Sequence, residues 1–260
     1  MKPQTDLTPI RTLLIAAALM FLAGQNSSAQ QTLKIRGASR SYDMTIREGA
    51  CDGRREAVPD ANADDDEARP ARLVIYRKGA GAPFQVLCLP SVRVYKDHLA
   101  NNSARPGARR VLYDESYTLV FGDFNFDGRE DFAVCNGANG GYGGPSYDVY
   151  VFDKAARKFV ENRRLSRLAG EGYLGMFSAD AKRKLLVAQS KSGCCYHETQ
   201  KYKVVNDRPR LVEKVTEDAM TGDGVTITTV KLVNGKWVKR VRRERRRAKS
   251  EQPAADRNGI

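Results

Sequence analysis

The sequence predicts an all-β protein made of antiparallel strands, because short β-rich runs alternate with turn residues along most of the chain. Asn234-Gly235 separates the runs Val225–Val233 and Lys236–Val241, and both residues tolerate a positive φ, as a two-residue hairpin turn requires. Few segments favour a helix. Asp153–Leu168 suits a strand and a turn as well as a helix.

The runs expected to form strands are rich in β-branched, aliphatic and aromatic residues and are bounded by Gly, Pro, Asn or Asp. They are Leu33–Arg36, Leu73–Tyr76, Phe84–Cys88, Val92–Tyr95, Tyr117–Phe121, Tyr147–Phe152, Lys184–Gln189, Thr199–Val205, Val225–Val233 and Trp237–Val241. A second hairpin is expected to join Lys201–Asn206 to Arg210–Lys214. The acidic stretch Asp52–Pro70 is expected to be a surface loop.

Residues 1–29 have the layout of a cleaved secretory signal peptide. Lys2 and Arg11 precede the apolar run Leu13–Leu22, and Ser27-Ser28-Ala29 supplies small residues before a cleavage point near Ala29. The run is too short for a transmembrane helix, which needs about 20 apolar residues. We therefore expect a periplasmic or secreted protein without a transmembrane segment in its mature form.

The chain is basic, with 44 Lys and Arg against 31 acidic residues and a net charge of +13. The segment 239–260 contributes nine basic and three acidic residues and almost no apolar ones, which predicts a basic, disordered C-terminal tail. Such a tail could contact peptidoglycan or an anionic envelope surface. An exported protein is not expected to meet nucleic acid.

The segment Asp123–Asp131 reads Asp-Phe-Asn-Phe-Asp-Gly-Arg-Glu-Asp and places oxygen ligands in the register of a calcium loop. The predicted ligands are the side chains of Asp123, Asn125, Asp127 and Asp131 and the carbonyl of Arg129. An EF-hand has a Glu at the twelfth position, which here is Val134, and β-type residues flank the loop on both sides. Calcium is therefore predicted to bind between two strands. The alternative is an Asp/Asn/Gly turn without a metal.

The segment Ser192-Gly193-Cys194-Cys195-Tyr196 lies between two expected strands and predicts a constrained turn that presents the hydroxyls of Ser192 and Tyr196. An ordinary disulfide-pinned hairpin is the alternative. An enzyme is not expected, because the chain has two histidines, no nucleophile elbow and no acid pair outside the metal loop. A Cys195/His197 nucleophile pair lacks an evident orienting group.

Ser-Gly-x-x-Tyr at Ser192–Tyr196, together with Asp123–Asp131 and Asn136–Tyr147, resembles the bacterial periplasmic inhibitors of invertebrate-type lysozyme (PliI-type). The calcium loop itself resembles that of FG-GAP repeats. The resemblance covers about Val111–Val238 and implies a propeller-like β-fold that inhibits lysozyme. It also implies that Ser192, Gly193 and Tyr196 form the loop that enters the lysozyme cleft. Residues 30–110 then form a separate N-terminal β-rich region without a match.

Five cysteines in an exported chain predict disulfides with one thiol left over: Cys51, Cys88, Cys135, Cys194 and Cys195. Anchoring of the Ser192 loop suggests that Cys135 pairs with Cys194 or Cys195, so that calcium would stiffen the same edge. Cys51 and Cys88 share the N-terminal half and are paired on that ground. A bond between Cys194 and Cys195 is the minor alternative.

A function of another class also fits these features. The chain could be a secreted, calcium-stabilised structural or envelope-interaction module without inhibitory activity. Inhibition requires Ser192 and Tyr196, whereas envelope binding requires the basic residues.

Overall fold

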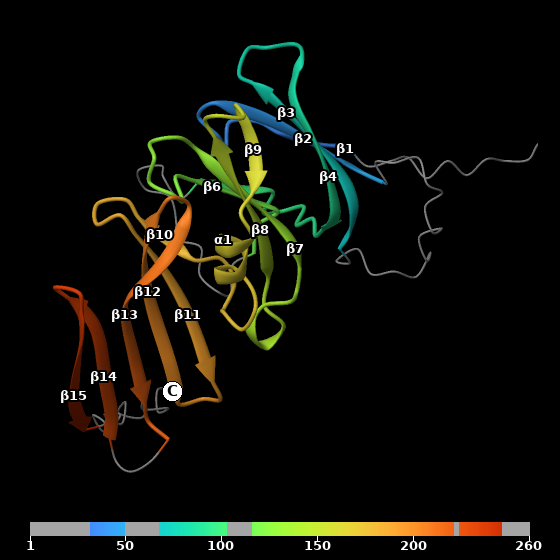
Figure 1. The fold of residues 1–260 in the computed structure, drawn as a ribbon. Coiled ribbons are helices and arrows are strands. Elements are labelled where there is room, and N and C mark those ends of the chain that lie inside the picture. The colour runs from blue at the N-terminus through green and yellow to red at the C-terminus, as the bar shows by residue number, and fades with distance from the viewer. Residues whose placement is uncertain (1–31, 50–67, 103–115, 221–223, 246–260) are drawn as a thin grey trace, which may run out of the picture. The chain divides into compact units, whose positions relative to one another are not determined.

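The structure is a computed structural model that describes residues 32–49, 68–102, 116–220 and 224–245 (Figure 1). These residues all belong to one compact unit spanning 31–260. The predicted signal peptide, Cys51 and most of the expected loop Asp52–Pro70 lie outside the described residues. None of the helices in the described ranges is long and apolar enough to span a membrane.

The described chain is almost entirely β and forms three sheets. The N-terminal sheet has the order β1-β2-β3-β4 and is antiparallel throughout. Its strands are β1 (Thr32–Ile35), β2 (Tyr42–Glu48), β3 (Arg69–Arg77) and β4 (Pro83–Val92). Each strand pairs with the next one along the chain, which makes the sheet a simple meander.

The central sheet has the order β5-β6-β7-β8-β9. Its strands are β5 (Ala100–Asn102), β6 (Leu119–Gly122), β7 (Asp131–Gly137), β8 (Ser146–Asp153) and β9 (Lys158–Glu161). The β5–β6 pair is parallel and the other pairs are antiparallel. A 3₁₀ turn, η1 (Gly141–Gly143), lies between β7 and β8, and the helix α1 (Arg163–Leu168) follows β9.

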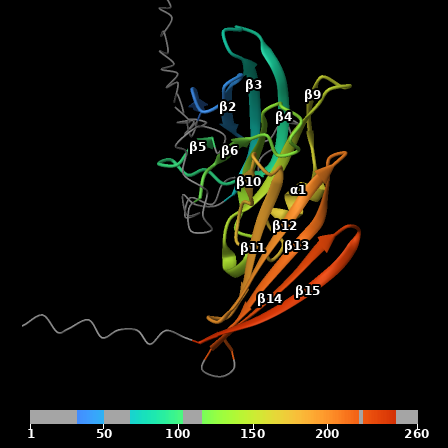
Figure 2. The ribbon, with the colours of Figure 1, turned by 90° about the vertical axis from the view of Figure 1, so that its left-hand side faces the viewer.

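The C-terminal sheet is an antiparallel meander with the order β10-β11-β12-β13-β14-β15 (Figure 2). Its strands are β10 (Ser178–Asp180), β11 (Leu185–Ser192), β12 (Tyr196–Val205), β13 (Arg208–Asp218), β14 (Gly224–Val233) and β15 (Lys236–Arg245). Tight turns join β11 to β12, β12 to β13 and β14 to β15.

The central sheet is buried on both faces. Phe121, Phe132 and Tyr150 lie in a core shared with the N-terminal sheet. Val120 and Ala133, which alternate with them along β6 and β7, lie in a second core shared with α1 and the C-terminal sheet. Because successive side chains of a strand point to opposite faces, nearly every residue of β6 and β7 has to be apolar.

The prediction of an antiparallel all-β fold is confirmed, and the propeller-like arrangement stays a prediction. The expected hairpin at Asn234-Gly235 forms, with φ of 50° and 77° at the two turn residues and Val233 paired with Lys236. Val92–Tyr95 does not form a strand of its own, because β4 ends at Val92. The sequence also missed β2, in which polar residues alternate with Met44 and Ile46.

The predicted disordered tail is wrong for its first residues. Lys239–Arg245 continue β15 and pair with β14 along its length, up to Gly224 opposite Arg245. The few apolar residues in this segment suggested disorder, but hydrogen bonds between its backbone and β14 hold it as a strand. Residues 246–260 lie outside the described residues. The predicted boundary between 30–110 and 111–238 also falls in an undescribed range, 103–115, and strands from both sides share one core.

We predict that Phe132→Ala lowers the free energy of unfolding by about 3–5 kcal/mol, since its buried ring packs against Tyr150 and Phe159 with ring centroids 5.1 and 4.9 Å away. Val160→Ala, at an exposed position of the neighbouring β9, should change it by no more than about 0.5 kcal/mol. Denaturant unfolding measures both. Equal losses in the two variants would contradict the doubly buried central sheet.

Candidate functional site

The predicted calcium loop joins β6 to β7 in the central sheet. Phe124 anchors it, because its ring is buried and packs edge-on against Phe177 at 5.4 Å. Phe126 and Gly128 both have a positive φ, 60° and 85°, so the loop contains two residues with a left-handed backbone conformation. The glycine of the motif therefore occupies a position where a left-handed backbone is needed.

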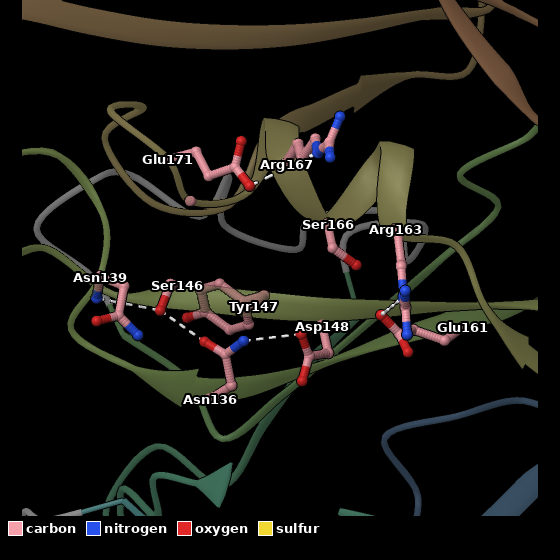
Figure 3. A pocket seen from close by; sticks show the side chains of 11 residues that line it. Asn136, Asn139, Ser146, Tyr147, Asp148, Glu161, Arg163, Ser166, Arg167 and Glu171 are labelled. Atoms are coloured by element: carbon pink, nitrogen blue, oxygen red, sulfur yellow. Dashed lines mark hydrogen bonds and ion pairs between the residues drawn. The ribbon is translucent and has the colours of Figure 1, made fainter. Parts of the chain in front are cut away.

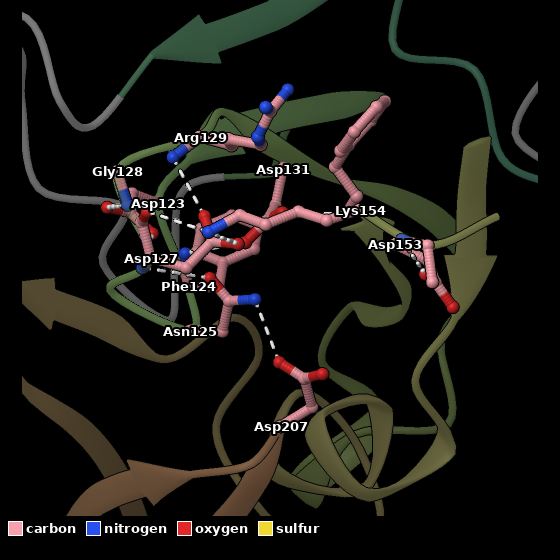
Figure 4. A network of polar contacts seen from close by, with 12 residues as sticks. Asp123, Phe124, Asn125, Asp127, Gly128, Arg129, Asp131, Asp153, Lys154 and Asp207 are labelled. Atoms are coloured by element: carbon pink, nitrogen blue, oxygen red, sulfur yellow. Dashed lines mark hydrogen bonds and ion pairs between the residues drawn. The ribbon is translucent and has the colours of Figure 1, made fainter. Parts of the chain in front are cut away.

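The first residues of the loop brace one another through side-chain to backbone hydrogen bonds (Figure 4). The Asp123 carboxylate accepts from the amides of Asp127 at 3.0 Å and Gly128 at 2.9 Å. Asn125 Oδ1 also accepts from the Asp127 amide, at 3.2 Å. The side-chain oxygens of Asp123 and Asn125 are thus engaged by backbone amides within a tight turn.

The fifth residue of the loop has a basic partner. The Asp127 carboxylate accepts from the Arg129 amide at 2.8 Å and forms an ion pair with Lys154 Nζ at 3.1 Å. Lys154 comes from the β8–β9 turn and also donates to the Asp127 carbonyl at 3.4 Å. The ammonium group of Lys154 therefore contacts a carboxylate that the sequence predicts as a calcium ligand.

Asp131, the last residue of the motif, is the first residue of β7 and is only 1% exposed. Its carboxylate accepts from the amides of Phe124 at 2.9 Å and Phe152 at 3.0 Å. Burial raises the pKa of Asp131 to about 7, and the nearby charges of Asp123 and Asp127 add to the rise. A bound cation would favour the ionised form of this carboxyl group.

The donor set of the loop suits calcium, which prefers carboxylate, amide and carbonyl oxygens. Within the described ranges, however, no three acidic, His or Cys side chains converge on one point as metal ligands do. The carboxylates of Asp123, Asp127 and Asp131 accept hydrogen bonds from backbone amides instead. The Asp127 carboxylate also forms an ion pair with Lys154. For calcium to bind, Asp127 would have to release the Lys154 ammonium group and coordinate the metal instead. Calcium binding stays a prediction.

The loop also connects the central sheet to the C-terminal sheet. Asn125 Nδ2 donates to Asp207 Oδ1 at 2.8 Å, and Asn162 Nδ2 donates to the Asp207 carbonyl at 2.8 Å. Asp207 lies in the β12–β13 turn with a φ of 56°. Sequence reasoning assigned Asp207 to a turn but not to this site, because only the packing of the sheets brings the two loops together.

The Ser-Gly-x-x-Tyr segment forms the β11–β12 turn. Ser192 and Tyr196 are opposite each other in the last antiparallel pair, so their side chains lie on the same face of the sheet. Gly193, with a φ of 62°, begins the three-residue turn, and Cys194 and Cys195 follow it. Ser192 is exposed and Tyr196 is partly exposed.

A disulfide closes the turn between the adjacent residues Cys194 and Cys195. The predicted bond from Cys135 to either residue is wrong, since Cys135 is a free, buried thiol on β7. The minor alternative is therefore the pairing observed. Cys88 is disulfide-bonded, and its predicted partner Cys51 lies outside the described residues.

Tyr142 from the η1 turn contacts the Ser192–Tyr196 turn, which the sequence did not predict. Its hydroxyl accepts from the Gly193 amide, and Lys191 Nζ lies 4.7 Å from the centre of its ring. Tyr142 is 64% exposed and has a φ of 58°. The sequence did contain a pattern that could have indicated this role. In Gly140–Gly144 a single tyrosine is flanked by two glycines on each side, and such a segment bends tightly and exposes its one large side chain.

The backbone around both turns is tightly anchored. Gly141 donates to the Tyr173 carbonyl at 2.7 Å, and a Cβ at Gly140 would lie 2.6 Å from the Pro145 carbonyl oxygen. The carbonyl of Cys195 accepts from the Ala219 amide at 2.8 Å, just after β13. We define the tip as Tyr142 together with Ser192–Tyr196.

The tip and the predicted calcium loop lie at opposite ends of the fold, so the expectation that calcium stiffens the edge of the Ser192 loop is wrong. The tip lies at the start of β12, whereas Asp207, which contacts the predicted calcium loop, follows the end of β12. A ten-residue strand separates them, which corresponds to roughly 30 Å. The link that a Cys135 disulfide would have provided is absent, because Cys135 is a free thiol buried on β7.

A polar cavity of about 330 Å³ lies beside β8 and α1 (Figure 3). Asn136 donates to the Asp148 carboxylate at 2.7 Å and accepts from Ser146 Oγ at 2.6 Å. Burial raises the pKa of Asp148, and the charge of Glu161 adds to the rise. The polar groups lining this cavity bond largely to one another, and Asn136, Asn139, Ser146 and Tyr147 fall in the segment Asn136–Tyr147 that carries part of the resemblance to PliI-type inhibitors.

Comparisons with known proteins identify the fold but not the family. No family model matches the sequence, and no curated protein matches it significantly. A solved structure described as "Structure of a Xanthomonas Type IV Secretion System related protein" is similar, with a TM-score of 0.61 and 22% sequence identity. The match covers 82% of this chain and 94% of that chain. At this identity the likeness shows a shared fold.

We predict that calcium binds to the Asp123–Asp131 loop with a dissociation constant of roughly 10⁻⁴–10⁻³ M and raises the melting temperature. Asp127→Ala should abolish the rise, because it removes a central ligand. Asp180→Ala, at the last residue of β10, serves as a control and should retain it. Calorimetry that detects no calcium binding to the metal-stripped wild type would refute the site.

The raised pKa of Asp131 predicts a pH dependence. Below about pH 7 a proton occupies this carboxyl group in the metal-free protein, so apparent calcium affinity should fall by up to roughly tenfold per pH unit. The folded-state pKa exceeds the unfolded value of about 3.9, so the stability of the metal-free protein should decrease as pH rises from about 4 to 7. Titrations at pH 8 and 6, and metal-free melting curves, measure both effects. A pH-independent affinity would contradict them.

The cysteine assignments predict the labelling pattern of the native protein. Cys135 should react with a thiol reagent only after denaturation, because it is fully buried and burial raises its pKa. Peptide mapping without reduction should recover Cys194 and Cys195 within one peptide, joined to each other. A mixed peptide that contains Cys135 and either of them would overturn the assignment.

Proposed function

We propose that this protein is a periplasmic, calcium-binding inhibitor of lysozyme that acts through the tip. The observation that carries the proposal is the closed turn at Ser192–Tyr196. Two hydroxyl side chains lie on one face of a hairpin end, and a disulfide between adjacent residues restrains the backbone between them. The resemblance of this segment to Ser-Gly-x-x-Tyr of PliI-type inhibitors supplies the target.

The chemistry of the target fits such a tip. A lysozyme cleft presents two carboxyl groups on either side of the scissile sugar bond. A serine hydroxyl and a tyrosine hydroxyl can donate hydrogen bonds to these groups while the turn blocks the sugar subsites. Lys191, which stacks on Tyr142 at the side of the tip, adds a positive charge that complements the carboxylates.

Restraint of the tip favours tight binding, because a flexible loop loses conformational freedom when it enters a cleft. Three features restrain it in the free protein: the Cys194–Cys195 bond, the Gly193 amide bound to the Tyr142 hydroxyl, and the Cys195 carbonyl bound to the Ala219 amide. The calcium loop has a different role in this proposal. It stabilises the contact between the central and C-terminal sheets through Asn125 and Asp207.

Two further observations are compatible with the proposal. The similar Xanthomonas structure is described as related to a type IV secretion system, which suits a protein of the cell envelope. Cys194 and Cys195 at the tip are joined in a disulfide, so neither is a free thiol nucleophile, which suits a binding role. His197 lies one residue beyond Tyr196 on the opposite face of β12.

Inhibition assays with invertebrate-, chicken- and goose-type lysozymes in calcium test the proposal. Tyr196→Ala should weaken inhibition by about thirtyfold or more, since truncation of an interface tyrosine typically costs about 2 kcal/mol. Its melting temperature should stay close to that of the wild type, because the tip is outside both cores. Ser192→Ala should weaken inhibition to a smaller extent.

Tyr76→Ala, at a partly exposed position of β3, is the matched control and should inhibit like the wild type. A chain that ends after Arg245 keeps β15 intact and should also retain inhibition. If the wild type inhibits none of the three lysozymes, or if Tyr196→Ala inhibits equally well, the proposed function is wrong.

A further inference from the structure

The β14–β15 hairpin ends in exposed apolar side chains on both of its faces. Leu232 pairs with Trp237 on one face, and the exposed fractions of their side chains are 36% and 51%. Val233 and Val238, with 44% and 40%, lie on the other face. Both faces of the hairpin are thus exposed at its turn. Four large apolar residues therefore face solvent at one turn, which marks an interaction site.

Basic side chains surround this apolar turn. The hairpin 224–245 contains seven Lys and Arg and one Glu, so its net charge is 7 − 1 = +6. Lys231 has an acidic partner in Glu213 at 3.2 Å. No acidic side chain within the described ranges forms an ion pair with Lys236, Lys239 or Arg240.

We propose that the turn of the β14–β15 hairpin docks onto an anionic lipid bilayer. In this arrangement the Trp237 ring and the three aliphatic side chains enter the interfacial region, where amphipathic aromatic rings are favoured. The lysines and Arg240 then meet the negatively charged headgroups. An anionic bilayer is the proposed partner because the hairpin combines an apolar turn with basic side chains around it.

Other occupants fit these observations less well. A polyanion such as nucleic acid would complement the charge but would leave the apolar end without a partner. A second copy of this chain, paired through the free edge of β15, would place like charges side by side, which disfavours the pairing. Lipid headgroups and acyl chains are complementary to both parts of the hairpin.

This surface is independent of the tip that carries the proposed function. The β14–β15 turn lies at the end of the C-terminal sheet that also carries the β12–β13 turn, whereas the Ser192–Tyr196 turn lies at the other end (Figures 1 and 2). A bilayer bound at the hairpin would therefore leave the tip free to reach a partner.

Trp237 makes the proposal directly testable, since it is the single tryptophan of the chain. The mature chain is mixed with vesicles of phosphatidylcholine containing phosphatidylglycerol, and tryptophan emission is recorded. We expect a blue shift, quenching by brominated lipid, and loss of both at high salt. Vesicles of phosphatidylcholine alone should give a shift at least about tenfold weaker at equal lipid concentration.

Charge reversal provides the matched comparison. Lys236→Glu combined with Lys239→Glu should weaken vesicle binding by at least about tenfold. Lys34→Glu with Lys78→Glu is an equal charge change at exposed lysines, one on β1 and one in the β3–β4 turn, and it should have little effect. Circular dichroism checks that both variants fold.

Three results would overturn the proposal: no emission shift with anionic vesicles, equal loss of binding in the two double variants, or a shift produced by DNA or by protein concentration but not by vesicles. Lysozyme inhibition, measured without lipid, should be unchanged in all variants, so failure of one proposal is distinguishable from failure of the other.

Discussion

Burial of the central sheet on both faces is the constraint on which the rest of the structure depends. Phe121 and Phe132 contribute to one core while their neighbours Val120 and Ala133 contribute to the other. Neither set can move without disturbing two layers at once. The positions of the loops at the ends of β6 and β7 are therefore fixed by packing rather than by the loops themselves.

This constraint separates two polar regions. At one end of β7, Asp131 accepts two buried backbone amides and closes the Asp123–Asp131 loop. At the other end, the chain enters the glycine-rich turn that carries Tyr142 to the Ser192–Tyr196 hairpin. Acidic residues gather at the first region, whereas hydroxyl side chains and a disulfide form the second. A stabilising metal and a recognition surface would thus act without competing for the same residues.

The C-terminal sheet contributes a third region, because it is longer than its contact with the central sheet. Its first strands pack on the central sheet through Leu186, Ala188 and Tyr202. The later strands extend beyond that contact, and every residue of β15 is exposed. Their stability comes from backbone pairing and from ion pairs such as Lys201 and Lys231 with Glu213. A strand pair of this kind contributes little to a core, which is consistent with a role at the surface.

The sequence by itself determined the features that depend on neighbouring residues. Antiparallel strands, the Asn234-Gly235 hairpin, the tight turn at Gly128 and the turn at Ser192–Tyr196 all follow from local periodicity and from residues that accept a positive φ. Only the tertiary structure decided which distant residues meet. It left Cys135 as a buried free thiol, brought Asp207 to the acidic loop and Tyr142 to the tip, and paired β15 with β14 as far as Arg245. These outcomes depend on how three sheets pack, and no short segment of sequence encodes that packing.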